Sequence, residues 1–441
     1  MHAKALLTLV GGILIHITLG TMYTSSNLTP YVVSYLHVAK KHAYIDSSLS
    51  PWLFALQSLG QAIAMVIGGT LQRLFGIRLA MITGCCLVTI STLCGYWTVN
   101  NYFVICSTYG LIFGLGIGIA YSSPLTAAMK WFPKSRGLVN GLILFGFGFG
   151  SLIFNFLQTF IINPKNVKPI LDPTGVSDEK FFPLEVCTRV PKVFLVMGAC
   201  YFALQLIGLL MISEPTEEEV KEMTAQTEDL LDNAKPEEEG MCTKDAMKQC
   251  TFWQLWFTIM FVSITNIFIS SFFKFFGQMI IHDDFFLTLV ASISSICNGI
   301  CRPFWGWVND KLGYKKTMSL MLTIFTAFLA TFAFTPENCK WRFMLWVCML
   351  YFCIGGAFAV FPAYTHLCFG SKYFGSIYGM AFSSIIVSAI TAALFVTTMV
   401  KKIGVMGITI SLSCLMVIGL IVTIAPKAWT YHDVEKKENP V

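Results

Sequence analysis

The chain consists largely of long apolar segments, each about twenty residues in length, separated by short clusters of charged residues. About twenty consecutive apolar residues are what an α-helix needs to cross the hydrocarbon core of a bilayer. Of all residues, 55% are hydrophobic and only 12% are charged. Lipid tolerates only helices or closed barrels, and these segments are too continuously apolar for barrel strands. The sequence therefore predicts an all-α multi-pass membrane protein.

Apolar segments of this kind mark twelve membrane-spanning helices. An even number of crossings places both ends of the chain on the same side of the membrane. We interpret the first segment as a retained helix and not as a signal peptide, because it lacks a small-residue cleavage site. The predicted spans are residues 5–30, 50–72, 79–99, 102–128, 137–162, 192–212, 252–279, 286–308, 316–334, 343–367, 376–399 and 404–425.

An acidic, hydrophilic stretch at residues 214–250 divides these helices into two groups of six. Its glutamate clusters and its scarcity of aromatic residues are typical of a solvated linker. We predict a first bundle at residues 1–213, a cytoplasmic linker, a second bundle at residues 251–427 and a cytoplasmic tail at residues 428–441. Lys and Arg are more frequent in the short loops on the linker's side, which predicts that both termini are cytoplasmic.

Composition and motifs argue against several classes of function. The net charge of +6 does not indicate a nucleic-acid partner, because Lys and Arg at helix ends mainly set membrane topology. The 15 cysteines are scattered through apolar segments without metal-ligand spacing, so we predict neither a metal site nor a cofactor. No nucleophile elbow, phosphate loop or His/Glu metal pair suggests an enzyme. We expect a monomer in the plasma membrane or an internal organelle membrane, with the lipid bilayer and a small-molecule substrate as its partners.

The two halves of the sequence resemble each other at a nearly constant offset of about 237 residues. Such a repeat is the expected trace of a transporter built from two related bundles, and it predicts twelve helices in two pseudo-symmetric six-helix bundles. The matched segments are 69–78 with 306–315, Pro124 with Pro362, and 134–141 with 372–379.

The turns between the second and third helices of each half resemble the signature of the major facilitator superfamily. In that signature an Asp and basic residues lie between two glycines. The second copy fits this pattern well, whereas Arg73 in the first copy stands where the family usually has an aspartate. The resemblance implies that these turns form part of an inner gate. The implied gating residues are Gly69, Arg73, Gly76, Lys134, Arg136, Gly306, Asp310, Lys311 and Gly313.

A closer resemblance is to the oxalate/formate antiporter family, and it covers nearly the whole membrane region. Lys130–Gly141 looks like that family's Lys-Trp-Phe-Pro-x-x-Arg-Gly-x-x-x-Gly motif, Asn298–Trp307 looks like its eighth helix, and Leu19–Tyr23 fits its first helix. The monocarboxylate transporters share the architecture but match less closely. The resemblance implies a substrate path between the halves, alternating access, and small carboxylates as typical cargo.

Arg302 is the charged residue in the eighth span that most needs an explanation. It precedes Asp310 by eight residues, which places it about 12 Å from the inner turn, too deep to reach the interface easily. Asn298 and Ser295 lie one and two helical turns before it, on the same face, so the three side chains can together hold a carboxylate. The alternative is an internal ion pair. Monocarboxylate transporters typically carry an aspartate at the position of Asn298; because Asn298 cannot titrate, antiport or facilitated diffusion is favoured over that form of proton symport.

Ile385 stands in the eleventh helix where the oxalate/formate pattern has a lysine. With only one buried cation, a dianion would remain half-neutralised, which costs several kcal/mol in a site of low dielectric. We therefore expect a monocarboxylate as the cargo. A neutral or zwitterionic solute is the alternative, and a transport-inactive sensor or scaffold is a third hypothesis, suggested by the acidic linker and the tail.

Other polar side chains lie within the presumed path. His16, near the middle of the first span, is a candidate for binding cargo or sensing protonation, with a neutral histidine bonded to a neighbouring helix as the alternative. The remaining candidates share a polar tip on a cavity-lining helix, and each has an interhelical hydrogen bond as its alternative role. They are Tyr23, Tyr121, Asn266, Tyr351 and Tyr364.

Overall fold

The computed structural model describes most of the chain. The described residues are 2–42, 45, 49–132, 136–172, 180–216, 218–219, 240–281, 283–336, 339–370 and 373–424. Lys134, most of the predicted linker and the whole predicted tail lie outside them, and so does the side chain of Arg136.

Long helices make up the first bundle and confirm the all-α prediction. The first crossing is a continuous helical rod of four pieces that ends at Ala39, well beyond the predicted residue 30. The elements are α1 (His2–Leu19), η1 (Gly20–Thr24), α2 (Ser25–Ser34), η2 (Tyr35–Ala39), α3 (Ser50–Phe75), α4 (Ile77–Thr98), α5 (Tyr102–Ile105), η4 (Cys106–Ile112), α6 (Phe113–Trp131), α7 (Arg136–Ile162) and α9 (Val190–Met211).

The second bundle follows a short helix, α11. Its last two crossings share one helical element, α17. Gly404 adopts a φ of 65° inside α17, a left-handed conformation that glycine accepts readily, and there the eleventh crossing turns into the twelfth. The elements are α11 (Thr243–Ala246), α12 (Cys250–Ile280), α13 (Asp284–Leu312), α14 (Tyr314–Phe332), α15 (Lys340–Phe369), α16 (Phe374–Phe382) and α17 (Ser384–Ile424).

Among the described residues, 10 helical segments are both long and apolar enough to cross a membrane. The two that complete the twelve are α13 and α14, with 29 and 19 residues. At 1.5 Å per residue, α13 is longer than the hydrocarbon core of about 30 Å, and α14 is close to that length. They are less apolar because α13 contains Arg302 and α14 begins with Lys315 and Lys316 after its first residue.

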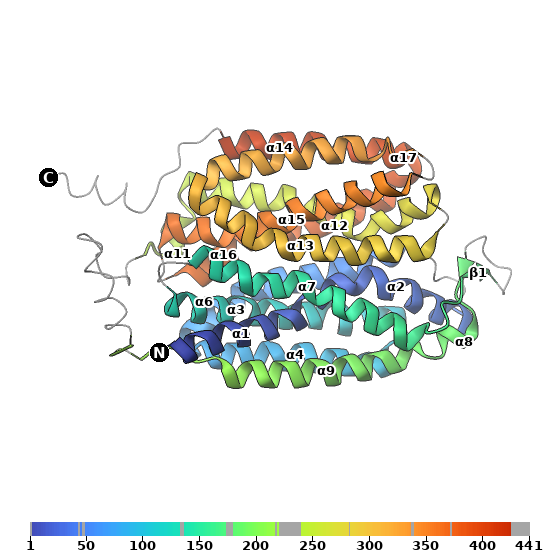
Figure 1. Ribbon diagram of the computed structural model, residues 1–441, viewed down its shortest axis with the longest axis horizontal. Coiled ribbons are helices and arrows are strands. Elements are labelled where there is room, and N and C mark those ends of the chain that lie inside the picture. The colour runs from blue at the N-terminus through green and yellow to red at the C-terminus, as the bar shows by residue number, and fades with distance from the viewer. Residues whose placement is uncertain are drawn as a thin grey trace.

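The two bundles lie side by side, with residues 2–211 in the lower half of Figure 1 and residues 250–424 in the upper half. We call the end at which α1 begins and α9 and α17 end the linker face. The opposite end, the hairpin face, carries β1 (Ile170–Leu171), β2 (Lys180–Phe181) and α8 (Leu184–Cys187), which belong to the long connection between α7 and α9 (Figure 1).

The connection on the hairpin face packs onto the end of the first rod. The strands β1 and β2 pair antiparallel, and Asp172, just after β1, accepts a bond from Nε2 of the buried His37 at 3.1 Å. The His37 ring stacks on Phe181 at 4.0 Å between centroids. These contacts attach the described part of the connection to η2.

Glycines allow the two bundles to approach closely. A Cβ atom on Gly148 of α7 would lie 2.8 Å from the Cα of Gly299 on α13, and one on Gly69 of α3 would lie 2.6 Å from the carbonyl carbon of Gly375 on α16. Real side chains do not fit at these distances, so the helices meet backbone to backbone. These contacts bring α13 and its Arg302 against the first bundle.

The repeated glycine turns adopt the same backbone conformation. Gly76 ends α3 with φ 87° and ψ 164°, and Gly313 ends α13 with φ 76° and ψ 163°. A positive φ of this size strains any residue with a side chain, which explains glycine at both positions. The pseudo-symmetry predicted from the sequence is confirmed at this turn.

Candidate functional site

Arg302 lies at the boundary between the bundles and is only 1% exposed. Its Nε donates to the backbone oxygen and to Oδ1 of Asn298, both at 3.3 Å, and its Nη2 donates to the same Oδ1 at 3.1 Å. Nη1 is buried without a hydrogen-bond partner. Within the part of the chain that the structure describes, no Asp or Glu pairs with Arg302, so an internal ion pair does not account for this charge.

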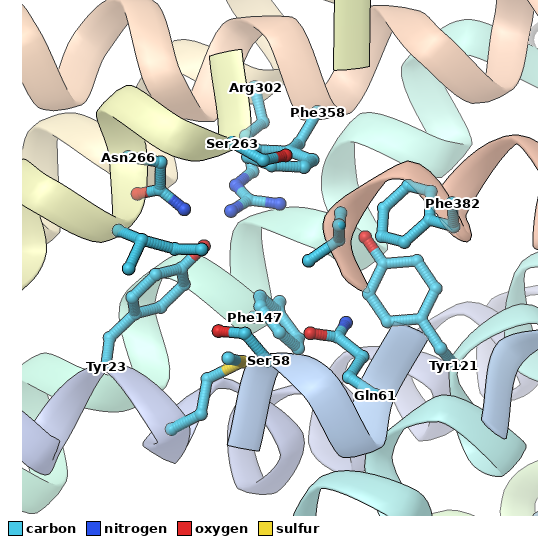
Figure 2. A pocket seen from close by; sticks show the side chains of 13 residues that line it. Tyr23, Ser58, Gln61, Tyr121, Phe147, Ser263, Asn266, Arg302, Phe358 and Phe382 are labelled. Carbon is cyan, nitrogen blue, oxygen red and sulfur yellow. The ribbon is translucent and has the colours of Figure 1, made fainter. Parts of the chain in front are cut away.

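A small cavity lies between the bundles at the level of this arginine. Figure 2 shows the guanidinium of Arg302 pointing from α13 into this space, with Tyr23 and Gln61 facing it from the first bundle. The guanidinium carbon also lies 5.5 Å from the centre of the Phe147 ring, within the range of a cation–π contact. The lining residues are Met22, Tyr23, Ser58, Gln61, Tyr121, Phe147, Ser263, Asn266, Ile267, Arg302, Phe358, Phe382 and Ile385.

The wall of the first cavity is mostly uncharged. Arg302 is its only charged lining residue among those described, and the other polar groups are hydroxyls and amides. Ile385, at the start of α17, is 5% exposed and forms part of the wall. The position at which the resemblance implied a second cation is therefore an apolar surface of the cavity.

A second, smaller cavity lies next to the first, and Tyr23 lines both. Its walls carry hydroxyl and amide groups and no charged residue within the described part of the chain. The lining residues are Tyr23, Ser26, Ser151, Asn155, Phe273, Ala291, Ser295, Asn298 and Tyr351.

The structure divides the predicted binding residues between these two cavities. Tyr23, Tyr121, Asn266 and Arg302 line the first, whereas Ser295, Asn298 and Tyr351 line the second, together with Tyr23. Asn298 and Ser295 therefore do not surround the same space as the guanidinium, as their helical spacing suggested. The Oδ1 of Asn298 is occupied by Arg302, and the Ser295 hydroxyl donates to Ala291 O of its own helix at 2.9 Å.

His16 and Tyr364 line neither cavity. The Nδ1 of His16 lies 3.0 Å from Gly12 O, and its ring packs behind Tyr121 at 5.3 Å between centroids. Tyr364 stacks on Tyr314 at 3.5 Å between centroids. Both side chains thus pack against neighbouring residues. The sequence does not show which way an apolar helix is rotated.

Sequence reasoning missed the contribution of the second helix. Ser58 and Gln61 of α3 reach the first cavity, although the resemblance did not place this helix among those that line the path. The signal was present, because the two polar residues are three positions apart in an apolar helix and so share a face. Phe147, Phe358 and Phe382 gave no such signal among the 38 phenylalanines of the chain.

The predicted gating residues that the structure describes in α3 and α13 lie toward the linker face. Gly69 packs on Gly375 of the opposite bundle, and the guanidinium carbon of Arg73 lies 5.9 Å from the centre of the Tyr373 ring, also across the boundary. Arg73 therefore contacts the second bundle at the position where an aspartate was expected. Gly306 is buried within α13, whereas Asp310 and Lys311 near its end are exposed.

A twelve-helix membrane protein with two similar bundles and a polar cavity at their boundary has the architecture of a membrane transporter. The family model for the Major Facilitator Superfamily matches residues 10–289 and, in a second match, residues 255–440. The chain belongs to this superfamily, which confirms the resemblance seen in its motifs.

Relatives and solved structures agree with this assignment. The chain is 27% identical to "Apicoplast pyruvate carrier 1" of Toxoplasma gondii, over 91% of this chain and 85% of the relative. It is 26% identical to the "Oxalate:formate antiporter" of Oxalobacter formigenes, over 78% of this chain and 74% of the relative. A crystal structure of a D-xylose–proton symporter superposes with a TM-score of 0.66 at 14% identity, over 97% of this chain and 99% of the other, which shows the fold alone.

Proposed function

We propose that this protein transports small monocarboxylates across a membrane, by antiport or facilitated diffusion, and that Arg302 binds the carboxylate. The observation that carries this proposal is the buried guanidinium with an unpartnered Nη1, which lines a cavity and pairs with no acidic residue among those described. A buried charge without a partner is unfavourable, so a site of this kind gains stability when an anion enters it. The names of two relatives, a pyruvate carrier and an oxalate:formate antiporter, support the same class of cargo.

The cavity favours a monoanion over a dianion. One cation neutralises one carboxylate, and the surrounding Phe147, Phe358 and Ile385 offer no second charge. Asn298 acts in this proposal as a positioning residue, because its Oδ1 holds the guanidinium in place and leaves Nη1 for the cargo. Transport then proceeds by rocking of residues 1–213 against residues 251–427, with the close contacts of Gly69 and Arg73 opening at the linker face.

We place the linker face in the cytoplasm, in agreement with the Lys and Arg bias of its loops. The hairpin face then lies outside the cell or in the lumen of an organelle. The name of one relative, an apicoplast carrier, supports an organelle membrane, and the plasma membrane is the alternative.

The test compares the wild-type protein with Arg302→Gln and with a matched control, Arg342→Gln. Arg342 stacks on Trp346 at 4.8 Å and lines neither cavity, so its substitution removes the same charge elsewhere in the second bundle. Thermal stabilisation is measured with acetate, propanoate, malonate and glycerol, because a bound ligand raises the apparent stability. Stabilisation by monocarboxylates in the wild type and the control, lost in Arg302→Gln, supports the proposal.

Two results of this experiment contradict the proposal. Equal stabilisation of Arg302→Gln by monocarboxylates would show that the arginine does not bind them. Stabilisation by the neutral solute in all three proteins, with no response to any carboxylate, would favour the alternative of a neutral or zwitterionic cargo. Uptake of the responding compound into liposomes containing the wild-type protein then distinguishes a transporter from a transport-inactive sensor.

A further inference from the structure

The second cavity lies between the arginine cavity and the hairpin face. On α13 it is lined by Asn298 and Ser295, one and two turns from Arg302 toward the start of that helix. On α7 it is lined by Ser151 and Asn155, one and two turns from Phe147 toward the end of that helix. At 1.5 Å per residue these steps correspond to about 6 to 12 Å along the helix axes.

One residue in the wall of this second cavity has an unsatisfied polar group. Asn155 is 4% exposed, and its Oδ1 is buried without a hydrogen-bond partner. By contrast, the neighbouring amides Asn27 and Gln158 bond to each other at 3.1 Å. A buried amide that lines a cavity and lacks a partner is satisfied when a ligand group or a water occupies the space.

The chemistry of the walls restricts what the second cavity accepts. Ser26, Ser151 and Tyr351 add hydroxyl groups to the amides, and none of the described lining residues is charged. A second carboxylate or an ammonium would lose its hydration there without gaining an opposite charge. A neutral hydroxyl or amide group forms hydrogen bonds without that loss.

We propose that the second cavity is a specificity subsite that binds an uncharged hydrogen-bonding group at the far end of the cargo. This inference rests on the proposed function, in which Arg302 binds the carboxylate. The two cavities share Tyr23, and Asn298 contacts the guanidinium while lining the second cavity, so one solute spans both. The preferred cargo is a monocarboxylate with a hydroxyl or amide several bonds from its carboxylate, and Asn155 is its partner.

The experiment compares acids of three lengths with and without a terminal hydroxyl. The pairs are propanoate with 3-hydroxypropanoate, butanoate with 4-hydroxybutanoate, and pentanoate with 5-hydroxypentanoate, each titrated by calorimetry against the purified full chain. One neutral hydrogen bond corresponds to about a fivefold gain in affinity. We expect such a gain from the hydroxyl in at least one of the two longer pairs, and its loss in Asn155→Leu.

A matched control and a milder variant keep this test decisive. Asn140 lies on the same helix, is 2% exposed and lines neither cavity, so Asn140→Leu should retain the gain from the hydroxyl. Tyr351→Phe removes one hydroxyl of the second cavity without removing the ring, and should lower the gain if Asn155→Leu does not fold.

The outcomes separate this inference from the proposed function. If no hydroxyl improves binding at any length, the cavity holds water only and the inference is wrong. It is also wrong if the gain persists in both Asn155→Leu and Tyr351→Phe, or falls equally in Asn140→Leu. If Asn155→Leu loses the gain from the hydroxyl but binds the plain acids normally, the result supports the subsite and leaves the role of Arg302 unaffected. Unchanged binding of the plain acids by Arg302→Gln, or no binding of any acid by the wild type, refutes the proposed function and the inference with it.

Discussion

Replacement of Ile385 by lysine should change the preference of the cavity from monoanions toward dianions. Ile385 is 5% exposed and shares the arginine cavity, so a side chain with an ammonium group at this position enters the space that the cargo occupies. In the wild-type cavity, Arg302 neutralises only one carboxylate of a dianion. In the Ile385→Lys variant, the second carboxylate also has an opposite charge nearby.

The size of this effect follows from Coulomb's law. For two unit charges about 6 Å apart, with an effective dielectric constant of about 20, the interaction is about 3 kcal/mol, or roughly a hundredfold in affinity. A monoanion held at Arg302 also feels the new charge, but less strongly. We therefore expect the ratio of dianion to monoanion affinity to rise by about tenfold to a hundredfold. The desolvation of the lysine affects both ligands and cancels from this ratio.

The assay is a titration of malonate and propanoate, which have the same number of carbons, against the wild type, Ile385→Lys and Ile385→Met. Methionine has a length similar to that of lysine and no charge, so this control should leave the ratio unchanged. The reasoning is refuted if Ile385→Lys still binds propanoate through Arg302 while its ratio equals that of Ile385→Met. That result would mean that residue 385 does not face the bound solute.

Three further predictions concern the contacts around the site. Gly148→Val should destabilise the packing of α7 on α13 by about 1 to 3 kcal/mol, because its Cβ has no room, and an unchanged Tm would contradict the close approach. Arg73→Gln and Tyr373→Leu should be coupled by about 0.5 to 1 kcal/mol in a double-mutant cycle of thermal stability, whereas additive effects would show that their contact across the boundary contributes nothing. On the hairpin face, a hydrogen bond from Lys340 lowers the pKa of Asp283 below its usual range. The stability that this carboxylate contributes is then present above its unfolded-state pKa and lost as the pH falls through its folded-state pKa. Lys340→Met should therefore reduce the fall of Tm in acid. A fall of Tm equal to that of the wild type would contradict the prediction.

The sequence alone determined the number of crossings, the two-bundle repeat and the depth of Arg302. These properties follow from local rules, because lipid requires apolar helices of a defined length and a charge within one of them stands out at once. The glycine turns were also predictable, since Gly76 and Gly313 share a positive φ that side chains avoid. The family resemblance rested on the same local motifs.

Only the tertiary structure decided which side chains meet. Its packing placed Arg302 in one cavity and Ser295 in another, turned His16 and Tyr364 away from both, and brought Gln61 to the first. In a helix that is apolar on every face, the sequence does not indicate which face turns toward the partner bundle. That rotation depends on backbone contacts between residues far apart in the chain, such as Gly148 with Gly299, and these contacts exist only once both bundles have packed together.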